Sequence, residues 1–415
     1  MLIFHVDVNS AYLSWTAASL LEKGYPTDIR TLPSAIAGDP RNRHGIILAK
    51  SIPAKKYGIQ TGESIMEAKQ KCPRLQLFPP DYDLFILCSD AMDEILSRYT
   101  PIIQRYSVDE SFMDCSGNSQ IYRAPVETAF SIKEEIKKSL GFTVNIGIGR
   151  NKTMAKMAGE LKKPDMVHTL WPHEIPTKLW PLPVSRLFMV GRATARKLQQ
   201  CNITTIGDLA GADSSFLRTI LKSHGQLIHD YANGIDPSPV IISEEVQQKS
   251  LGNSLTLSRD AVTKEEIFQE ALALCERIGM RLRRLGRRAS LVSVYLKNSS
   301  FSGCRHQVRL PIFINSTSDI YKVAKELIEE CWNGLPIRQV GVGLAHFSRG
   351  DEIQLSIWDA SVGEKQEDLD RTVDRIRSTF GERSIIRGTF ANSPADPIQG
   401  GVNDGNYLMM GGYKL

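Results

Sequence analysis

The sequence of 415 residues lacks the cysteine patterns of a metal-bound or disulfide-linked scaffold. It contains no C-x-x-C pair and no cysteine beside a histidine, and its seven cysteines are scattered (Cys72, Cys88, Cys115, Cys201, Cys275, Cys304 and Cys331). Scattered cysteines of this kind are typical of reduced thiols in the cytoplasm. We therefore expect neither a structural zinc site nor a disulfide framework.

Long apolar runs and repeats are also missing. No stretch approaches the ~20 apolar residues of a membrane-spanning helix, and Asp7 interrupts the N-terminal segment where a signal peptide has its apolar core. No repeat has solenoid spacing. Because 415 residues exceed the length of one typical domain, we expect a multidomain cytoplasmic protein with no membrane partner.

A strong overall charge is absent, but the basic residues are unevenly placed. The net charge is only +5. Between Cys275 and Leu310, however, there is one acid, Glu276, against nine basic residues (Arg277, Arg281, Arg283, Arg284, Arg287, Arg288, Lys297, Arg305 and Arg309). A local basic block favours contact with a phosphate backbone. A solvated helix face is the alternative that composition leaves open.

Two apolar, strand-like segments carry three carboxylates. The segment LIFHVDV ends at Asp7 and Val8, and RYSVDESFMD contains Asp109 and Glu110. Carboxylates are the ligands that Mg²⁺ prefers. Since neighbouring strand residues point to opposite faces, Asp109 and Glu110 can serve one site only at a turn or strand end. A helix cap or a turn is the alternative for any one of these acids.

The chain divides into an N-terminal α/β or α+β part and a C-terminal α+β part. Residues 125–140 predict a helix, followed by the strand FTVNIGIG and a helix from Lys152. The Pro-rich residues 172–183 and the segment 235–250 read as joints. From 251 to 347 the pattern β-α-β-β-α-β predicts a ferredoxin-like fold. An amphipathic helix at 363–380 and a Gly-rich end follow.

Four motifs resemble the Y-family DNA polymerases of the DinB/UmuC kind. Asp7 is followed five residues later by Tyr12, and S-x-D-E appears at Ser107–Glu110. Residues 49–73 form a third motif. The fourth, G-x-x-x-N-K-x-x-A-K-x-A-x-x-x-x-K-P, runs from Gly147 to Pro164. The resemblance extends in the right order from residue 1 to about 348.

The resemblance implies an α+β multidomain fold shaped like a right hand. The expected parts are a palm, fingers, a helix-hairpin-helix thumb, a linker, a ferredoxin-like little finger and a C-terminal extension (1–10 with 77–165, 11–76, 166–235, 236–250, 251–348 and 349–415). In the thumb, Met189 stands where glycine is common, which puts a close approach of backbone amides to DNA there in doubt.

It also implies roles for individual residues. Asp7, Asp109, Glu110 and the Val8 carbonyl would hold two Mg²⁺ ions. Tyr12 would exclude ribonucleotides, and Lys55 and Lys163 would hold the triphosphate. The little finger would meet DNA through its arginines (Arg283, Arg284, Arg287 and Arg288). Three departures from the DinB pattern favour the UmuC branch (Asn9, Ile52 and Lys55).

The pentapeptide QLSIW resembles the clamp-binding peptide of bacterial polymerases (Gln354, Leu355, Ser356, Ile357 and Trp358). The prediction is therefore a monomeric, low-fidelity DNA polymerase for damaged templates, with primer–template DNA, deoxynucleotides and a sliding clamp as partners. No separate exonuclease segment is apparent, so proofreading is not expected. The rival hypotheses are a catalytically weak, clamp-bound accessory and a non-catalytic DNA-binding scaffold.

Overall fold

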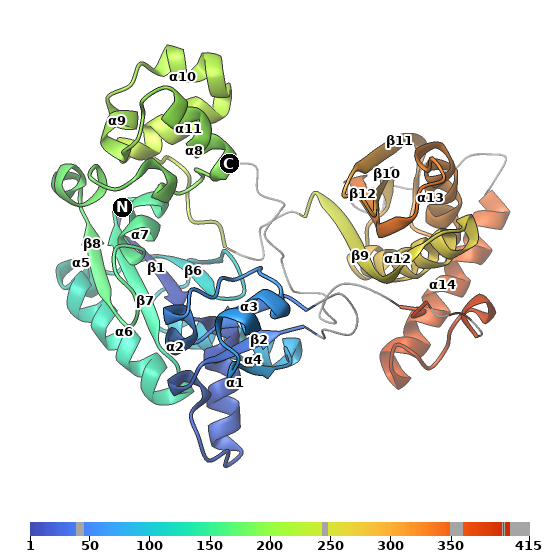
Figure 1. Cartoon of the computed structure of the whole chain (residues 1–415), viewed down its shortest axis with the longest axis horizontal. Helices are drawn as coiled ribbons and strands as arrows, with labels where there is room; N and C mark the ends of the chain where they lie inside the picture. The colour runs from blue at the N-terminus through green and yellow to red at the C-terminus, as the bar shows by residue number, and fades with distance from the viewer. Residues whose placement is uncertain (39–44, 243–247, 349–359, 392, 394, 399–415) are drawn as a thin grey trace. The chain divides into compact units, whose positions relative to one another are not determined.

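The computed structural model describes residues 1–38, 45–242, 248–348, 360–391, 393 and 395–398 (Figure 1). They form two compact units, one within Met1–Gly38 and Ile46–Val246 and the other within Gln247–Tyr407. This division falls inside the segment that the sequence suggests as a linker. Among the described helices, none is long and apolar enough to cross a membrane.

The first unit is built on a mixed five-stranded sheet. Its order is β5 (Ile103–Arg105), β6 (Glu110–Asp114), β1 (Ile3–Val8), β7 (Val144–Gly149) and β8 (Val167–Leu170). All neighbours are antiparallel except β7 and β8. Every residue of β1 is buried, so the strand that ends in the predicted acids is the centre of the sheet.

Helices flank this sheet along its length. Helix α6 (Pro125–Leu140) packs along β7 and β8, and α4 (Tyr82–Ser97) packs on α6. Helix α7 (Lys152–Gly159) lies against β7, β1 and β8. It begins where the Asn151 side chain accepts a hydrogen bond from the Met154 N–H (2.8 Å), a standard N-cap. The predicted helix–strand–helix order of residues 125–159 is confirmed.

A smaller α/β part follows β1 in the chain. Helix α1 (Ala11–Glu22) leads to the sheet β3 (Ile47–Lys50), β2 (Ser34–Ala37), β4 (Gln76–Phe78). Two short helices, α2 (Ile52–Lys56) and α3 (Ile65–Lys71), complete it. Their apolar residues form a separate core (Ala35, Ala37, Ile47, Ala54, Ile59, Ile65, Ala68, Cys72 and Leu75).

Four short helices end the first unit: α8 (Arg192–Gln200), α9 (Ile206–Ala210), α10 (Ser214–Leu221) and α11 (Ser223–Ala232). Their core includes Met154 and Met157 of α7, so the bundle is fixed to the sheet. Met189 has φ +72°, a left-handed conformation that glycine adopts without strain. This backbone conformation explains why glycine is common at the position that Met189 occupies here.

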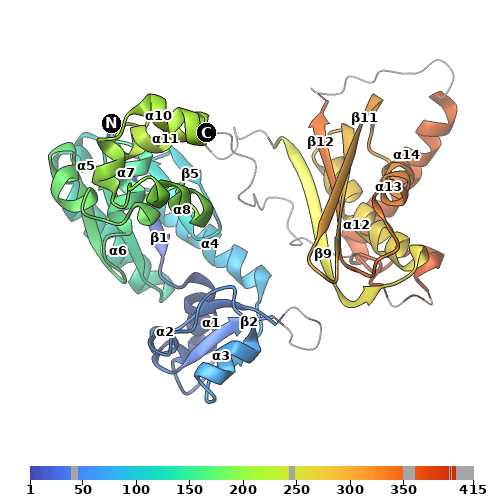
Figure 2. The ribbon, with the colours of Figure 1, turned by 45° about the horizontal axis from the view of Figure 1, so that its top comes forward.

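The second unit has the predicted β-α-β-β-α-β order: β9 (Ser250–Ala261), α12 (Lys264–Arg284), β10 (Ala289–Asn298), β11 (Gly303–Ile314), α13 (Thr317–Cys331) and β12 (Ile337–Phe347). The sheet order is β11-β10-β12-β9, with antiparallel neighbours. Figure 2 shows α12 and α13 on one side of this sheet. Alternate residues of β10, such as Val292 and Val294, are buried in the core with α12 and α13.

A third helix, α14 (Ala360–Phe380), covers α12 mainly through ion pairs. Arg283 pairs with Asp374 (2.6 Å), and Arg288 pairs with Glu367 (2.6 Å). Arg377 of α14 pairs with Glu276 of α12 (2.6 Å). Removing one partner of a buried pair leaves an uncompensated charge, so these contacts hold α14 in one place. The predicted helix at 363–380 is confirmed and begins slightly earlier.

The expectation of reduced thiols is wrong for two cysteines. Cys304 of β11 and Cys331 of α13 form a disulfide, with their Cα atoms 6.0 Å apart. The two are separated by 27 positions in the chain, so their proximity follows from the packing of α13 on β11. The other five cysteines are free, and no C-x-x-C spacing signals the bonded pair.

Candidate active site

Two of the predicted acids face each other on adjacent strands. Asp7 of β1 is the register partner of Glu110 of β6. Residues directly opposite in an antiparallel pair point to the same face of the sheet. The Val8 N–H donates to the carbonyl of Asp109 (3.0 Å), which ties the two strands together where the acids emerge. Strand pairing, rather than sequence proximity, assembles the site.

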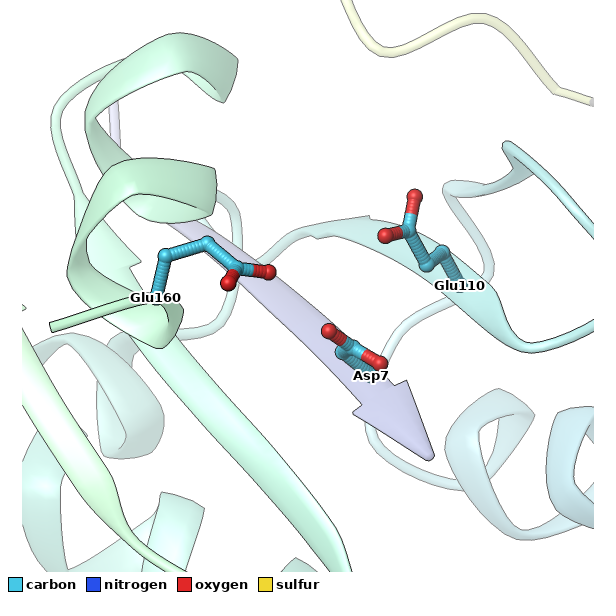
Figure 3. Close-up of side chains that lie close together, drawn as sticks. All are labelled: Asp7, Glu110 and Glu160. Atoms are coloured by element: carbon cyan, nitrogen blue, oxygen red, sulfur yellow. The ribbon is translucent and has the colours of Figure 1, made fainter. Parts of the chain in front are cut away.

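A third carboxylate joins this pair (Figure 3). Oxygen atoms of Asp7, Glu110 and Glu160 all lie within 4.8 Å of one another. Glu160 follows α7 directly, and Arg186 donates to its backbone carbonyl (2.8 Å). Clustered carboxylate oxygens at this spacing are a suitable ligand set for a divalent cation.

Asp109, the third acid expected from the sequence, is the chain neighbour of Glu110 but is not one of the three carboxylates of this cluster. It immediately precedes β6, and its carboxylate accepts a hydrogen bond from the Ser107 hydroxyl (2.6 Å). It is therefore at a strand start, as the alternation argument requires. Because Asp109 precedes the strand, the alternation that points successive strand residues to opposite faces does not apply to Asp109 and Glu110.

Two lysines neutralise the cluster. Lys163 contacts the carboxylate of Asp7 and lies 2.6 Å from Glu160. Lys156 of α7 lies 2.6 Å from Glu110. Its ammonium also lies over the rings of Tyr106 and Phe188, 5.3 and 5.5 Å from their centroids. Lys156 is thus held in place from three sides, with its side-chain nitrogen against Glu110.

The acids differ in their affinity for protons. Burial raises the pKa of Asp7 to about 7, against the opposing effect of Lys163, and burial also raises the pKa of Asp109. The pKa of Glu110 is lowered to about 2, because contacts with His5 and Lys156 outweigh the effect of burial. The raised pKa of Asp7 shows that Lys163 compensates its buried charge only in part. A divalent cation would supply the remaining positive charge, so the residues present fit such an ion.

His5 lies directly under the site. It is fully buried on β1, packs on the ring of Phe112 (centroids 4.7 Å apart), and places Nε2 3.8 Å from Glu110. Burial lowers the pKa of this imidazole, which favours its neutral form. His5 therefore limits where the Glu110 side chain can go.

Tyr12 projects from the first turn of α1, which begins after Ser10 (φ +51°). Its ring stacks on Phe85 of α4, with centroids 4.3 Å apart and an angle of 6° between the rings. Trp15 and Tyr82 approach it at 6.0 and 6.4 Å. Stacked aromatic pairs are stabilising beyond their buried area, so Tyr12 has a rigid support.

Asn9, one of the departures from the DinB pattern, joins three segments. Its amide donates to Asn145 (3.1 Å) and accepts from the Asp165 N–H (2.9 Å). The Thr143 hydroxyl also donates to it (3.0 Å). An ionised aspartate cannot donate to Asn145, so the amide of Asn9 makes a hydrogen bond here that aspartate would not make. Lys55 and Ile52 are both exposed on α2.

The four arginines proposed for DNA contact have different surroundings. Besides its pair with Asp374, Arg283 donates to the Asn315 carbonyl (2.9 Å), and Arg288 is paired with Glu367. Arg287 donates to the Ser348 carbonyl (2.8 Å). Arg284 is exposed. Ion pairs with α14 thus engage two of the four guanidinium groups. DNA contact by any of them stays a prediction.

The sheet face opposite α12 and α13 is a feature that the sequence did not reveal. Two of its register rows each combine an arginine, a larger apolar or aromatic residue and two small residues: Arg309, Leu291, Ala345 and Ser250 in one row, and Arg305, Tyr295, Gly341 and Ser254 in the other. The Arg305 guanidinium lies 5.8 Å from the Tyr295 ring. Arginines on such a face are suited to contact with a phosphate backbone.

Sequence reasoning also missed Glu160, Phe85 and a role for Lys156. Glu160 occupies a variable position of the motif that ends in Lys163 and Pro164, and Lys156 is a fixed position of the same motif. The periodicity of α7 was the available signal, because residues 156 and 160 lie one helical turn apart. The clamp-like residues Gln354, Leu355, Ile357 and Trp358 lie outside the described residues.

Comparisons with known proteins identify the family of the chain. Residues 6–160 match the impB/mucB/samB family, and residues 248–357 match its C-terminal domain. The chain is 46% identical to DNA polymerase IV of Clostridium acetobutylicum, over 93% of this chain and 97% of that protein. It is 34% identical to DNA polymerase IV 2 of Bacillus subtilis, over 93% of each.

Solved structures show the same fold. A Y-family DNA polymerase chimera of Dbh and Dpo4 matches with a TM-score of 0.73 and 21% identity, over 86% of this chain and all of that one. A Dbh ternary complex matches with a TM-score of 0.58, over 83% of this chain and 99% of that one. The relatives named above give the UmuC branch no support, and that refinement stays a prediction. The chain belongs to the impB/mucB/samB family and is a Y-family translesion DNA polymerase, an α+β multidomain enzyme that acts on DNA and deoxynucleotides.

Proposed function

We propose that Asp7, Asp109 and Glu110, with the Val8 carbonyl, hold two Mg²⁺ ions for transfer of a nucleotidyl group to a primer 3′-hydroxyl. The observation that carries the proposal is the pairing of Asp7 with Glu110 across β1 and β6, beside Asp109. Bound Mg²⁺ would activate the hydroxyl and neutralise the leaving pyrophosphate.

The protein side chains would contribute position and charge. Lys156 keeps Glu110 ionised, so that this carboxylate is ready to bind a cation without first losing a proton. His5 and the strand pairing hold it in register with Asp7. Preorganised charge of this kind stabilises the transition state without reorganisation during the reaction.

Primer extension by an Asp109→Ala variant tests the assignment. We expect a loss of at least about a thousandfold in the rate, since one removed electrostatic group costs ~10²–10³ and this change also removes a metal ligand. Circular dichroism should show an intact fold. Extension at the wild-type rate would remove Asp109 from the metal site.

We propose that Tyr12 excludes ribonucleotides. Its ring is held on Phe85. The ring therefore cannot rotate away to make room for a 2′-hydroxyl that is directed at it. Tyr12→Ala should raise ribonucleotide incorporation about a hundredfold or more relative to deoxynucleotides, a difference of ~2.7 kcal/mol. Competition between the two sugars in primer extension measures it, with Tyr82→Ala as the control. Unchanged sugar discrimination in Tyr12→Ala would contradict the proposal.

We also propose that Lys163 and Lys55 hold the triphosphate. Lys163 is supported by its position at the carboxylate cluster. Lys55 is supported by its exposure at the end of α2. Both act as point charges, since an ammonium lacks the bidentate geometry of arginine.

For DNA, we propose that contacts come from the basic sheet face of the second unit and from Arg284. The support is that Arg305 and Arg309 of β11 lie in register rows with the small residues Gly341 and Ala345 of β12. We further propose that the protein is a cytoplasmic monomer and that residues 354–358 bind a sliding clamp. Co-sedimentation with the clamp protein, with and without these five residues, tests the last point.

A further inference from the structure

We propose that Glu160 is a positioning residue that holds the ammonium of Lys163 toward the incoming triphosphate. This inference rests on the proposed contact between Lys163 and the nucleotide. It goes beyond it, because it gives a role to a glutamate outside the acids expected to bind metal.

The geometry shows Lys163 shared between two acids. Its ammonium contacts Asp7 on β1 and lies 2.6 Å from Glu160 at the end of α7. A cation that bound the oxygen of Asp7 which Lys163 contacts would displace the ammonium, and Glu160 would then remain as the protein partner of Lys163.

Glu160 is well placed to keep that contact. Its backbone carbonyl accepts a hydrogen bond from Arg186 (2.8 Å), and the N–H of Glu160 bonds to the carbonyl of Lys156 (3.3 Å). The side chain of Lys163 is 34% exposed, so without Glu160 it would explore many rotamers. Lysine loses rotamer entropy when it is ordered.

A glutamate that holds a phosphate-binding lysine is known in other phosphoryl-transfer enzymes. In protein kinases a glutamate on a helix forms an ion pair with the lysine that contacts the nucleotide phosphates, and activity requires this pair. Here the helix is α7, and the glutamate and lysine are separated by three positions. A lysine held in advance binds the triphosphate with a smaller loss of entropy.

The main alternative is that Glu160 binds the divalent cation itself. Oxygen atoms of its carboxylate, of Asp7 and of Glu110 lie within 4.8 Å of one another, so distance alone does not distinguish a positioning role from metal binding. Removing Lys163 distinguishes the two roles. If Glu160 acts through Lys163, its effect on nucleotide affinity must disappear when Lys163 is absent. If Glu160 is a metal ligand, its effect must persist.

The experiment uses the full chain on a primer–template with a dideoxy end, so that nucleotide binds without reacting. Equilibrium affinity for the complementary deoxynucleotide is measured in Mg²⁺ for wild type, Glu160→Gln, Lys163→Ala and the double variant. Glu134→Gln is the matched control, because Glu134 pairs with Lys133 (2.7 Å) on the exposed side of α6. Steady-state kinetics and Mg²⁺ titrations accompany the binding data.

We expect Glu160→Gln to weaken nucleotide binding about three- to tenfold, the range of a typical net hydrogen-bond contribution. KM should rise while kcat changes by less than about twofold, because a positioning contact is uniform between ground and transition states. In the Lys163→Ala background, Glu160→Gln should cause no further weakening. The control should match wild type.

Three results would overturn the inference. Unchanged affinity in Glu160→Gln, with weakened binding in Lys163→Ala, would leave the role of Lys163 intact and remove that of Glu160. Equal weakening with and without Lys163, or a raised Mg²⁺ requirement at unchanged nucleotide affinity, would make Glu160 a metal ligand. Unchanged affinity in Lys163→Ala would instead refute the proposed triphosphate contact, and the inference with it.

Discussion

A variant in which asparagine replaces Asp7 is expected to lose DNA synthesis and yet to unfold at a higher temperature than the wild-type protein at pH 8. The loss follows from removing a carboxylate at the centre of the proposed metal site. The gain in stability follows from the burial of that carboxylate, which raises its pKa from 3.8 to about 7.

The sign of the pH dependence follows from proton binding. Between pH 4 and 7 the folded protein holds a proton on Asp7 that the unfolded chain has released. The contribution of this group to the free energy of unfolding therefore falls as pH rises, by about 1.36 kcal/mol per pH unit. It is fully lost above pH 7. Asparagine carries no such charge. The free energy of unfolding of Asp7→Asn should therefore exceed that of the wild-type protein, by an amount that grows from near zero at pH 4 to on the order of 2–4 kcal/mol at pH 8.

Glu110 provides a comparison of opposite sign in the same site. Its folded pKa is about 2, below the ordinary value of 4.5. Its contribution to stability is present above pH 4.5 and is lost as pH falls toward 2. Glu110→Gln should therefore lower the unfolding temperature at neutral pH, with the difference narrowing in acid. Both variants should be inactive.

Thermal unfolding in a chelating buffer from pH 4 to 8 measures these effects. Adding Mg²⁺ should raise the unfolding temperature of wild type more than that of Asp7→Asn, since a ligand stabilises only the state that binds it. If Asp7→Asn is less stable than wild type at pH 8 without metal, then Lys163 compensates the buried charge more completely than burial opposes it.

The local elements of the fold were predictable, and the long-range contacts were not. The strand ending at Asp7, the helix at 125–140 and the β-α-β-β-α-β order follow from periodicity and from Pro and Gly positions. The register that places Asp7 opposite Glu110 depends on pairing across 103 positions, which alternation alone does not fix. The motif match supplied the grouping of these acids that periodicity could not.

The misreadings share one physical cause. The arginines of α12 look like a free basic face because their acidic partners, such as Glu367 and Asp374, lie some 80–90 positions later on α14. Cys304 and Cys331 look unrelated for the same reason. Glu160 looks like an ordinary surface acid until the end of α7 is placed over β1. In each case the decisive neighbour is distant in sequence.

Gly147 is the residue whose replacement by alanine should disturb the fold and the site together. It lies on β7 directly beneath α7. A Cβ atom at this position would stand 2.0 Å from the carbonyl oxygen of Ala155 and 2.3 Å from the backbone nitrogen of Gly159. Both atoms belong to the helix backbone, so no side-chain rotation relieves the overlap. The helix must move away from the sheet by about 1 Å or more to reach ordinary contact distance.

That movement has two measurable consequences. Overpacking of a dense core costs about 1–3 kcal/mol and occasionally more, so Gly147→Ala should lower the free energy of unfolding by about 3 kcal/mol. Because α7 carries Lys156 and leads into Glu160 and Lys163, the same shift should weaken nucleotide binding at temperatures where the protein is still folded. Gly117→Ala is the matched control, since no atom lies within 4 Å of a Cβ built at Gly117. Equal stability of the two variants would show that α7 can move away from β7 without a measurable cost in stability.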